Sequence, residues 1–185
     1  MSQQPRRSIV KGAAWAAPAV LATATIPAYA ASKPALDGWL VNKTSCSSST
    51  RMTYTIDGRG TYPQRGLWVS NAPASATIGA TKITQYVSTA AGSPTFQNGG
   101  ISHQWSTLAY DATAPVKTGY RAYTTTFSGT WQYNATNKLW LPSTLPYFTT
   151  TVDKCITALQ VITARFVTVN GTVYSFERSG TLRPA

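Results

Sequence analysis

The chain of 185 residues has few of the side chains on which most enzymes depend. It contains five acidic residues, one histidine and two cysteines, and it has no Cys-x-x-Cys pair. Serine and threonine nucleophiles need a positioned base, and the sequence has no Gly-x-Ser-x-Gly turn. The single histidine, His103, stands beside Trp105 in an alternating apolar segment, which favours packing over catalysis. We therefore predict a protein with no catalytic residues, no cofactor and no metal site.

The acidic residues are spread along the chain. A glycosidase needs two carboxylates on either side of the scissile bond, and a calcium loop needs closely spaced acids. Neither pattern occurs among the five acids, which are Asp37, Asp57, Asp111, Asp153 and Glu177. A small secreted glycan hydrolase is therefore an alternative hypothesis and not the preferred one.

Helical periodicity is also missing from the chain after residue 30. This part is rich in Thr, Tyr, Val and Trp and poor in Glu and Lys, which favours strands. Short alternating segments separated by turn residues predict an all-β, immunoglobulin-like β-sandwich or open barrel of about eight to ten antiparallel strands. Asn170-Gly171 between two alternating segments is the strongest hairpin signal.

The segments expected to form strands are defined by this alternation and by the turns that bound them. They are residues 36–42, 51–57, 67–70, 80–89, 101–110, 116–127, 130–133, 147–153, 157–169 and 172–177. We also expect a Ser/Thr-rich turn at 44–50, a hairpin joining 116–127 to 130–133, and a long connection at 134–146.

The first 30 residues have the composition of an export leader. Basic residues precede a mild, Ala-rich apolar run, and Ala28-Tyr29-Ala30 supplies the small residues of a cleavage site. The run is shorter than the roughly 20 apolar residues of a membrane span, and Pro18 interrupts it, so an uncleaved anchor is less favoured.

The basic part of this leader resembles a known export signal. Arg6-Arg7-Ser8-Ile9-Val10-Lys11 is similar to the twin-arginine (Tat) motif, Arg-Arg-x-apolar-apolar-Lys, in leaders of high-GC Gram-positive bacteria. The resemblance rests on Arg6, Arg7 and Lys11, and it covers only the leader. It implies a helical signal peptide at residues 1–30, recognition by the Tat export machinery, and a secreted or cell-wall-associated product. The small residues at 28–30 place cleavage after Ala30, with Ala31 or Ser32 as the alternative.

Residues 31–185 are long enough for one domain. Cys46 and Cys155 are 109 positions apart, and an even number of cysteines in an exported chain predicts one disulfide. Two free buried thiols are the alternative. Trp68 lies 22 positions after Cys46, which does not match the Cys–Trp–Cys spacing of true immunoglobulin domains. "Immunoglobulin-like" therefore describes the architecture and not the family.

Positive charge is in excess after the leader. Residues 31–185 carry 13 basic and five acidic residues, a surplus of eight, and the basic residues are scattered singly. A basic exported protein is attracted to anionic cell-wall polymers or acidic glycans. Residues 31–185 contain no run of Lys and Arg that would predict a specific nucleic-acid partner. The positive charge could also serve only to keep the protein in solution.

Aromatic residues are the most promising feature for binding. Trp68 and Trp105 lie in apolar segments and are predicted to be core residues. Residues 138–142 form an apolar segment inside a predicted connection, either an exposed tip or a folded-back plug. The candidate ligand-binding residues are Arg121, Tyr123, Trp131, Tyr133 and Trp140.

These observations together favour an exported, non-catalytic module of the cell envelope or extracellular space that binds anionic or glycan polymers. A subunit of a surface fibre or adhesin, joined through exposed strand edges, is a further alternative.

Overall fold

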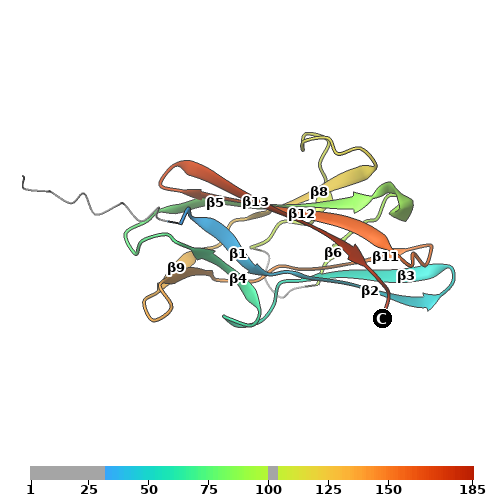
Figure 1. Ribbon diagram of the computed structural model, residues 1–185, viewed down its shortest axis with the longest axis horizontal. Coiled ribbons are helices and arrows are strands. Elements are labelled where there is room, and N and C mark those ends of the chain that lie inside the picture. The colour runs from blue at the N-terminus through green and yellow to red at the C-terminus, as the bar shows by residue number, and fades with distance from the viewer. Residues whose placement is uncertain (1–31, 100–103) are drawn as a thin grey trace, which may run out of the picture. The chain divides into compact units, whose positions relative to one another are not determined.

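The computed structural model describes residues 32–99 and 104–185, so the predictions for the leader and for His103 lie outside the described residues. The described part contains thirteen β-strands and one short 3-10 turn at Thr89–Ala91. None of its helices is long and apolar enough to cross a membrane. The predicted all-β sandwich is confirmed, with three antiparallel sheets (Figure 1).

The strands of each sheet follow one another in a fixed spatial order. The first sheet contains β1 (Ala35–Trp39), β4 (Gly66–Ser70), β10 (Leu139–Pro142) and β9 (Trp131–Asn134). The second contains β2 (Val41–Ser48), β3 (Arg51–Asp57), β11 (Tyr147–Val152) and β6 (Gln97–Asn98). The third contains β13 (Thr172–Leu182), β12 (Leu159–Val169), β5 (Ile78–Ser88), β8 (Tyr120–Phe127) and β7 (Ala109–Tyr110).

The first two sheets are two halves of one bent layer. The chain runs from β1 into β2 through Leu40 alone, and from β10 into β11 through residues 143–146. At the bend the Gly58 N–H donates to the Pro146 carbonyl at 2.8 Å. A Cβ on Gly58 would lie 2.7 Å from Leu40 Cδ2 and 2.9 Å from Pro146 Cγ, so a larger residue at this crossing would require those side chains to shift. The third sheet forms the opposite layer (Figure 1).

The core lies between the layers, where alternate residues of each strand point inward. In β3, for example, Met52, Tyr54 and Ile56 are buried, as their alternation predicted. Each large apolar side chain buried in this way contributes about 1.5–3 kcal/mol to stability. Trp105 is 2 % exposed and its Nε1 donates to the Thr144 carbonyl at 3.0 Å, so its predicted core position is confirmed. Trp68 is only half-buried.

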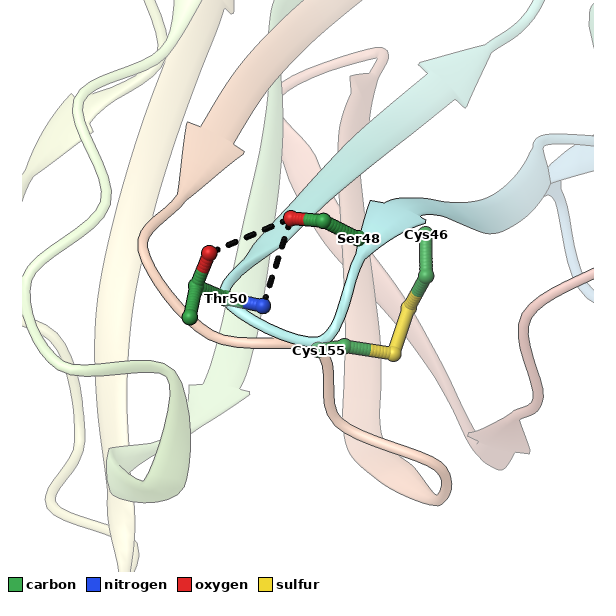
Figure 2. Close-up of a disulfide and its surroundings, with 4 residues drawn as sticks. All are labelled: Cys46, Ser48, Thr50 and Cys155. Carbon is green, nitrogen blue, oxygen red and sulfur yellow. Dashed lines mark hydrogen bonds between the residues drawn. A yellow bond between two sulfur atoms is a disulfide. The ribbon is translucent and has the colours of Figure 1, made fainter.

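The predicted disulfide is confirmed. Cys46 on β2 is bonded to Cys155 in the connection from β11 to β12, with Cα atoms 5.5 Å apart (Figure 2). The Cys155 N–H also donates to the Ser49 carbonyl at 3.1 Å. Closing a loop of this length restricts the unfolded chain and is worth about 4–5 kcal/mol in chain-entropy models. Such a bond is compatible with an oxidising compartment.

Several local predictions differ from the structure. Of the expected strand at 101–110, the described residues form only the two-residue strand β7 and an isolated bridge at Trp105. The expected turn at 44–50 is mostly strand, because β2 continues to pair with β3 as far as Ser48. The expected hairpin at Ser128-Gly129 is wrong, because β8 and β9 belong to different sheets and the chain crosses between layers there. The expected long connection at 134–146 contains β10, which pairs with β9. The hairpin at Asn170-Gly171 is confirmed, with φ values of 49° and 80°.

Candidate functional site

The five candidate residues from the sequence do not share one surface. Arg121 and Tyr123 lie on β8, whereas Trp131 and Tyr133 lie on β9 and Trp140 on β10, in another sheet. The wrong hairpin explains the difference, because it placed β8 beside β9.

Two pairs among these residues do come together. Tyr133 and Trp140 pack edge to face with ring centres 5.4 Å apart, and Trp140 Nε1 donates to the Pro73 carbonyl at 3.2 Å. Arg121 and Tyr123, with Tyr110, line an open groove of about 380 Å³.

Two of the five side chains also have contacts that belong to the fold. Tyr123 is only 3 % exposed and packs edge to face against Phe96 in the core. Trp131 packs against Phe127, with ring centres 5.5 Å apart. Packing within the fold therefore explains the positions of both aromatic rings.

A different site lies where the two layers meet at one side of the sandwich. Residues 39–42 of the bent layer line a pocket of about 350 Å³ together with residues of the third sheet. The latter are Val161, Thr163 and Arg165 of β12 and Arg178, Ser179, Gly180 and Leu182 of β13. We refer to it as the arginine pocket, because Arg165 and Arg178 both line it.

Strand register explains how an arginine comes to lie in this pocket. In β12, Val161, Val167 and Val169 are buried core residues, and Arg165 stands at the same period of two. Arg165 pairs with Phe176 of β13, and Thr163 pairs with Arg178. The side chain of Arg165 therefore occupies a position that the strand pattern reserves for an apolar residue.

Arg165 is a buried cation with few partners. It is 5 % exposed, and its Nη1 donates to the Gly38 carbonyl at 2.9 Å. Its Nε is buried and has no hydrogen-bond partner. The ion pairs among the described residues do not include Arg165. Burying a charge without a counter-charge costs several kcal/mol, so an unpartnered group of this kind calls for an explanation.

The electrostatics of the pocket reflect this burial. Loss of solvation is the main cause that lowers the pKa of Arg165 to about 10. The negative charge of Asp37 acts against this shift, and the positive charge of Arg178 adds to it. Asp37 is itself engaged, because its Oδ2 accepts the hydroxyl hydrogen of Ser70. The pocket thus holds two guanidinium groups beside a single carboxylate.

An aromatic ring stands at the rim of the pocket. Trp39 is 53 % exposed, which is unusual for a side chain of this size. The Arg178 guanidinium carbon lies 5.4 Å from the centre of its ring, within the range of a cation–π contact. The rim therefore offers a flat apolar surface next to positive charge.

The sequence contained a signal for this site. Arg165 is the one basic residue within the alternating segment 159–169, and the period of two already placed it on the inward face. The position of Trp39 could not be predicted in this way, because it depends on how β1 and β13 meet across the layers.

Four of the five acidic residues, Asp37 among them, have hydrogen-bond or ion-pair partners of their own. Asp57 forms an ion pair with Arg59 at 3.0 Å, and Glu177 forms one with Lys117 at 3.0 Å. Asp111 accepts hydrogen bonds from the backbone N–H and the hydroxyl of Thr113. Among the described residues, no three His, Cys, Asp or Glu side chains are grouped as metal ligands.

The negative charges of Asp111 and Glu177 both lie within electrostatic range of one tyrosine. Both act on Tyr86, whose pKa is raised chiefly by burial. Tyr86 lies in a small apolar cluster that also contains Ala114 and Ala122.

Comparison with models of known protein families gives no match to this chain, and no curated protein matches it either.

Proposed function

We propose that the protein is exported through the Tat route and acts, without catalysis, as a binding module for anionic or glycan polymers of the cell surface. The observation that carries this proposal is the arginine pocket. A guanidinium group is buried there without an ion pair among the described residues, in a pocket that also holds an exposed tryptophan.

An anionic ligand would supply what the pocket lacks. Hydrogen bonds between arginine and carboxylate or phosphate oxygens are charge-assisted and are about twice as strong as neutral ones. The ligand would offset the cost of burying Arg165, because it brings a negative charge into direct contact with the guanidinium group. The surplus of eight positive charges after residue 30 would attract such a polymer from a distance.

The polymer-binding proposal is tested by sedimentation with isolated cell walls. The unaltered protein is compared with Arg165→Met and with Arg51→Met, which removes the same charge at an exposed position. We expect the unaltered protein and Arg51→Met to sediment with the walls, and Arg165→Met to remain in the supernatant. No enrichment over a neutral control protein, or equal loss in both variants, would contradict the proposal.

Export is tested separately. Arg6→Lys combined with Arg7→Lys is expected to keep the protein inside the cell, since the paired arginines carry the resemblance to the Tat signal. Sequencing of the secreted protein is expected to give Ala31 as its first residue. Recovery of the intact chain from the cytosol of unaltered cells would argue against export.

The edge strand β13 supports a second candidate function, the subunit of a surface fibre. Nine of its eleven residues are exposed, and it has a neighbour on one side only. Its free backbone groups could pair with β13 of a second copy of this chain and continue the sheet. Light scattering during size-exclusion chromatography tests this, and a monomer at every concentration would argue against it.

A further inference from the structure

The free hydrogen-bonding capacity of Arg165 has a defined shape. A guanidinium group is planar and carries five N–H donors. The Nη1 of Arg165 binds the Gly38 carbonyl, and the Nε has no partner. Nε and Nη2 share one edge of the plane, and two parallel donors on one edge match the two oxygens of a carboxylate. Because Nε is closed off from solvent, bidentate binding of a carboxylate on this edge would need a small shift of the Arg165 side chain.

The charge balance of the pocket also suits a single anion. Arg165 and Arg178 bring two positive charges, and Asp37 is the acid that acts on Arg165. One bound carboxylate would bring the local charge close to zero. A doubly charged group such as a phosphate monoester would instead leave the pocket with an excess of negative charge.

The exposed Trp39 at the rim of the pocket favours a ligand that contains a ring. Trp39 presents an exposed indole beside the two arginines. An aromatic side chain of this kind packs well against the C–H face of a sugar ring. The volume of about 350 Å³ lies at the lower end of small-molecule sites, which fits a single sugar unit of a longer chain.

We propose that the arginine pocket binds a uronic acid unit of an acidic polysaccharide, with the carboxylate on Arg165 and the sugar ring on Trp39. This inference rests on the proposed function and narrows it to one class of polymer. A polymer of glycerol phosphate is disfavoured, because it has no ring to pack on Trp39.

The test is titration calorimetry on the purified protein with three probes: a trimer of galacturonic acid, its methyl ester, and a trimer of glycerol phosphate. The ester keeps the sugar rings and removes the negative charge. The variants are Arg165→Met and Trp39→Ala, with Arg51→Met as the control of equal charge. Thermal unfolding of each variant shows whether it is folded.

We expect the acid trimer to bind and the ester to bind about tenfold more weakly or worse. Arg165→Met is expected to weaken binding of the acid by about tenfold to a hundredfold, because it removes the charge-assisted pair. Trp39→Ala is expected to weaken acid and ester alike by about threefold to tenfold. Arg51→Met is expected to leave the affinity for the acid trimer unchanged.

Other outcomes would overturn the inference. Equal binding of acid and ester would show that the carboxylate is not recognised, and equal losses in Arg165→Met and Arg51→Met would indicate non-specific attraction. Binding of glycerol phosphate alone, lost in Arg165→Met, would retain the proposed function and reject the uronic acid. If Arg165→Met does not fold, the acid–ester comparison and Trp39→Ala, at an exposed side chain, decide the question.

Discussion

Two arginines in this molecule have opposite surroundings. Arg59 has a side chain that is 55 % exposed, and its Nε and Nη2 donate to the two carboxylate oxygens of Asp57 at 3.0 and 3.1 Å. Its guanidinium carbon also lies 3.7 Å from the centre of the Tyr147 ring. Arg165 is 5 % exposed, binds one carbonyl and has no ion pair. The exposed Arg59 is paired with a carboxylate, whereas the buried Arg165 is not.

The pKa values differ in the same sense. The hydrogen bonds that Arg59 donates to Asp57 raise the pKa of Arg59, whereas loss of solvation lowers the pKa of Arg165 to about 10. Selection for stability alone would favour the reverse arrangement, since a charge costs most where water is absent. Arg59 therefore stabilises the fold, whereas the burial of Arg165 without an ion pair is what the proposed binding role would explain.

The largest expected effect is at the paired arginine. Arg59→Met removes the partner of Asp57, whose side chain is only 8 % exposed and would be left charged and unpaired. We expect the free energy of unfolding to fall by about 2 kcal/mol, less than for a fully buried pair. Urea unfolding measures this, with Arg51→Met as the control at an exposed site. A loss of unfolding free energy no larger than that of Arg51→Met would mean that the ion pair of Arg59 does not stabilise the fold, and the contrast with Arg165 would fail.

The next effect has the opposite sign. Arg165→Met replaces a buried, unpaired charge with a flexible apolar side chain in a position flanked by core valines. We expect the free energy of unfolding to rise by about 1–2 kcal/mol while ligand binding is lost. Urea unfolding with the unaltered protein as reference measures the change. A large loss of stability would instead identify Arg165 as a brace between the layers, acting through its bond to Gly38.

Much of the fold could be predicted from local patterns, but the site could not. The Asn170-Gly171 turn and the alternation of residues 51–57 depend on neighbouring residues alone, and both predictions are confirmed. The crossing at Ser128-Gly129 has the same local signature as a hairpin. Which sheet β9 joins depends on pairing with β10, far beyond the turn. That one ambiguity placed Arg121 and Tyr123 of β8 beside β9, which belongs to another sheet.

The arginine pocket shows the same limit. The inward direction of Arg165 follows from the period of two, so this half of the site could be predicted. That Arg165 has no ion pair could not be predicted. The nearby acid is Asp37, which lies on a strand 128 positions earlier, and the Oδ2 of Asp37 accepts the hydroxyl hydrogen of Ser70. The spacing of residues along the sequence does not show which side chains will meet through tertiary contacts.

A smaller effect is expected when the acid of the paired region is altered. Asp57→Asn leaves Arg59 without its carboxylate, but Arg59 is exposed enough to be solvated by water. We expect the free energy of unfolding to fall by about 1 kcal/mol, less than for Arg59→Met. Urea unfolding with the exposed Asp153→Asn as control measures the change. A loss larger than that of Arg59→Met would reverse the asymmetry that burial predicts.

The smallest effect is a difference in acid sensitivity. Hydrogen bonding from Arg59 lowers the pKa of Asp57 below its ordinary value of 3.8, so the unfolded chain binds a proton more readily than the folded one. The stability that Asp57 contributes is therefore complete above the ordinary value and is lost as the pH falls through the lowered one. The gap in unfolding free energy between the unaltered protein and Asp57→Asn is expected to narrow over this range in urea titrations. Arg165→Met should show no such narrowing, because the lowered pKa of Arg165 lies near 10 and the group stays protonated throughout the acid range. A gap for Asp57→Asn that stays constant would mean that the carboxylate of Asp57 is not held by Arg59 in solution, and the contrast between the two arginines would then rest on burial alone.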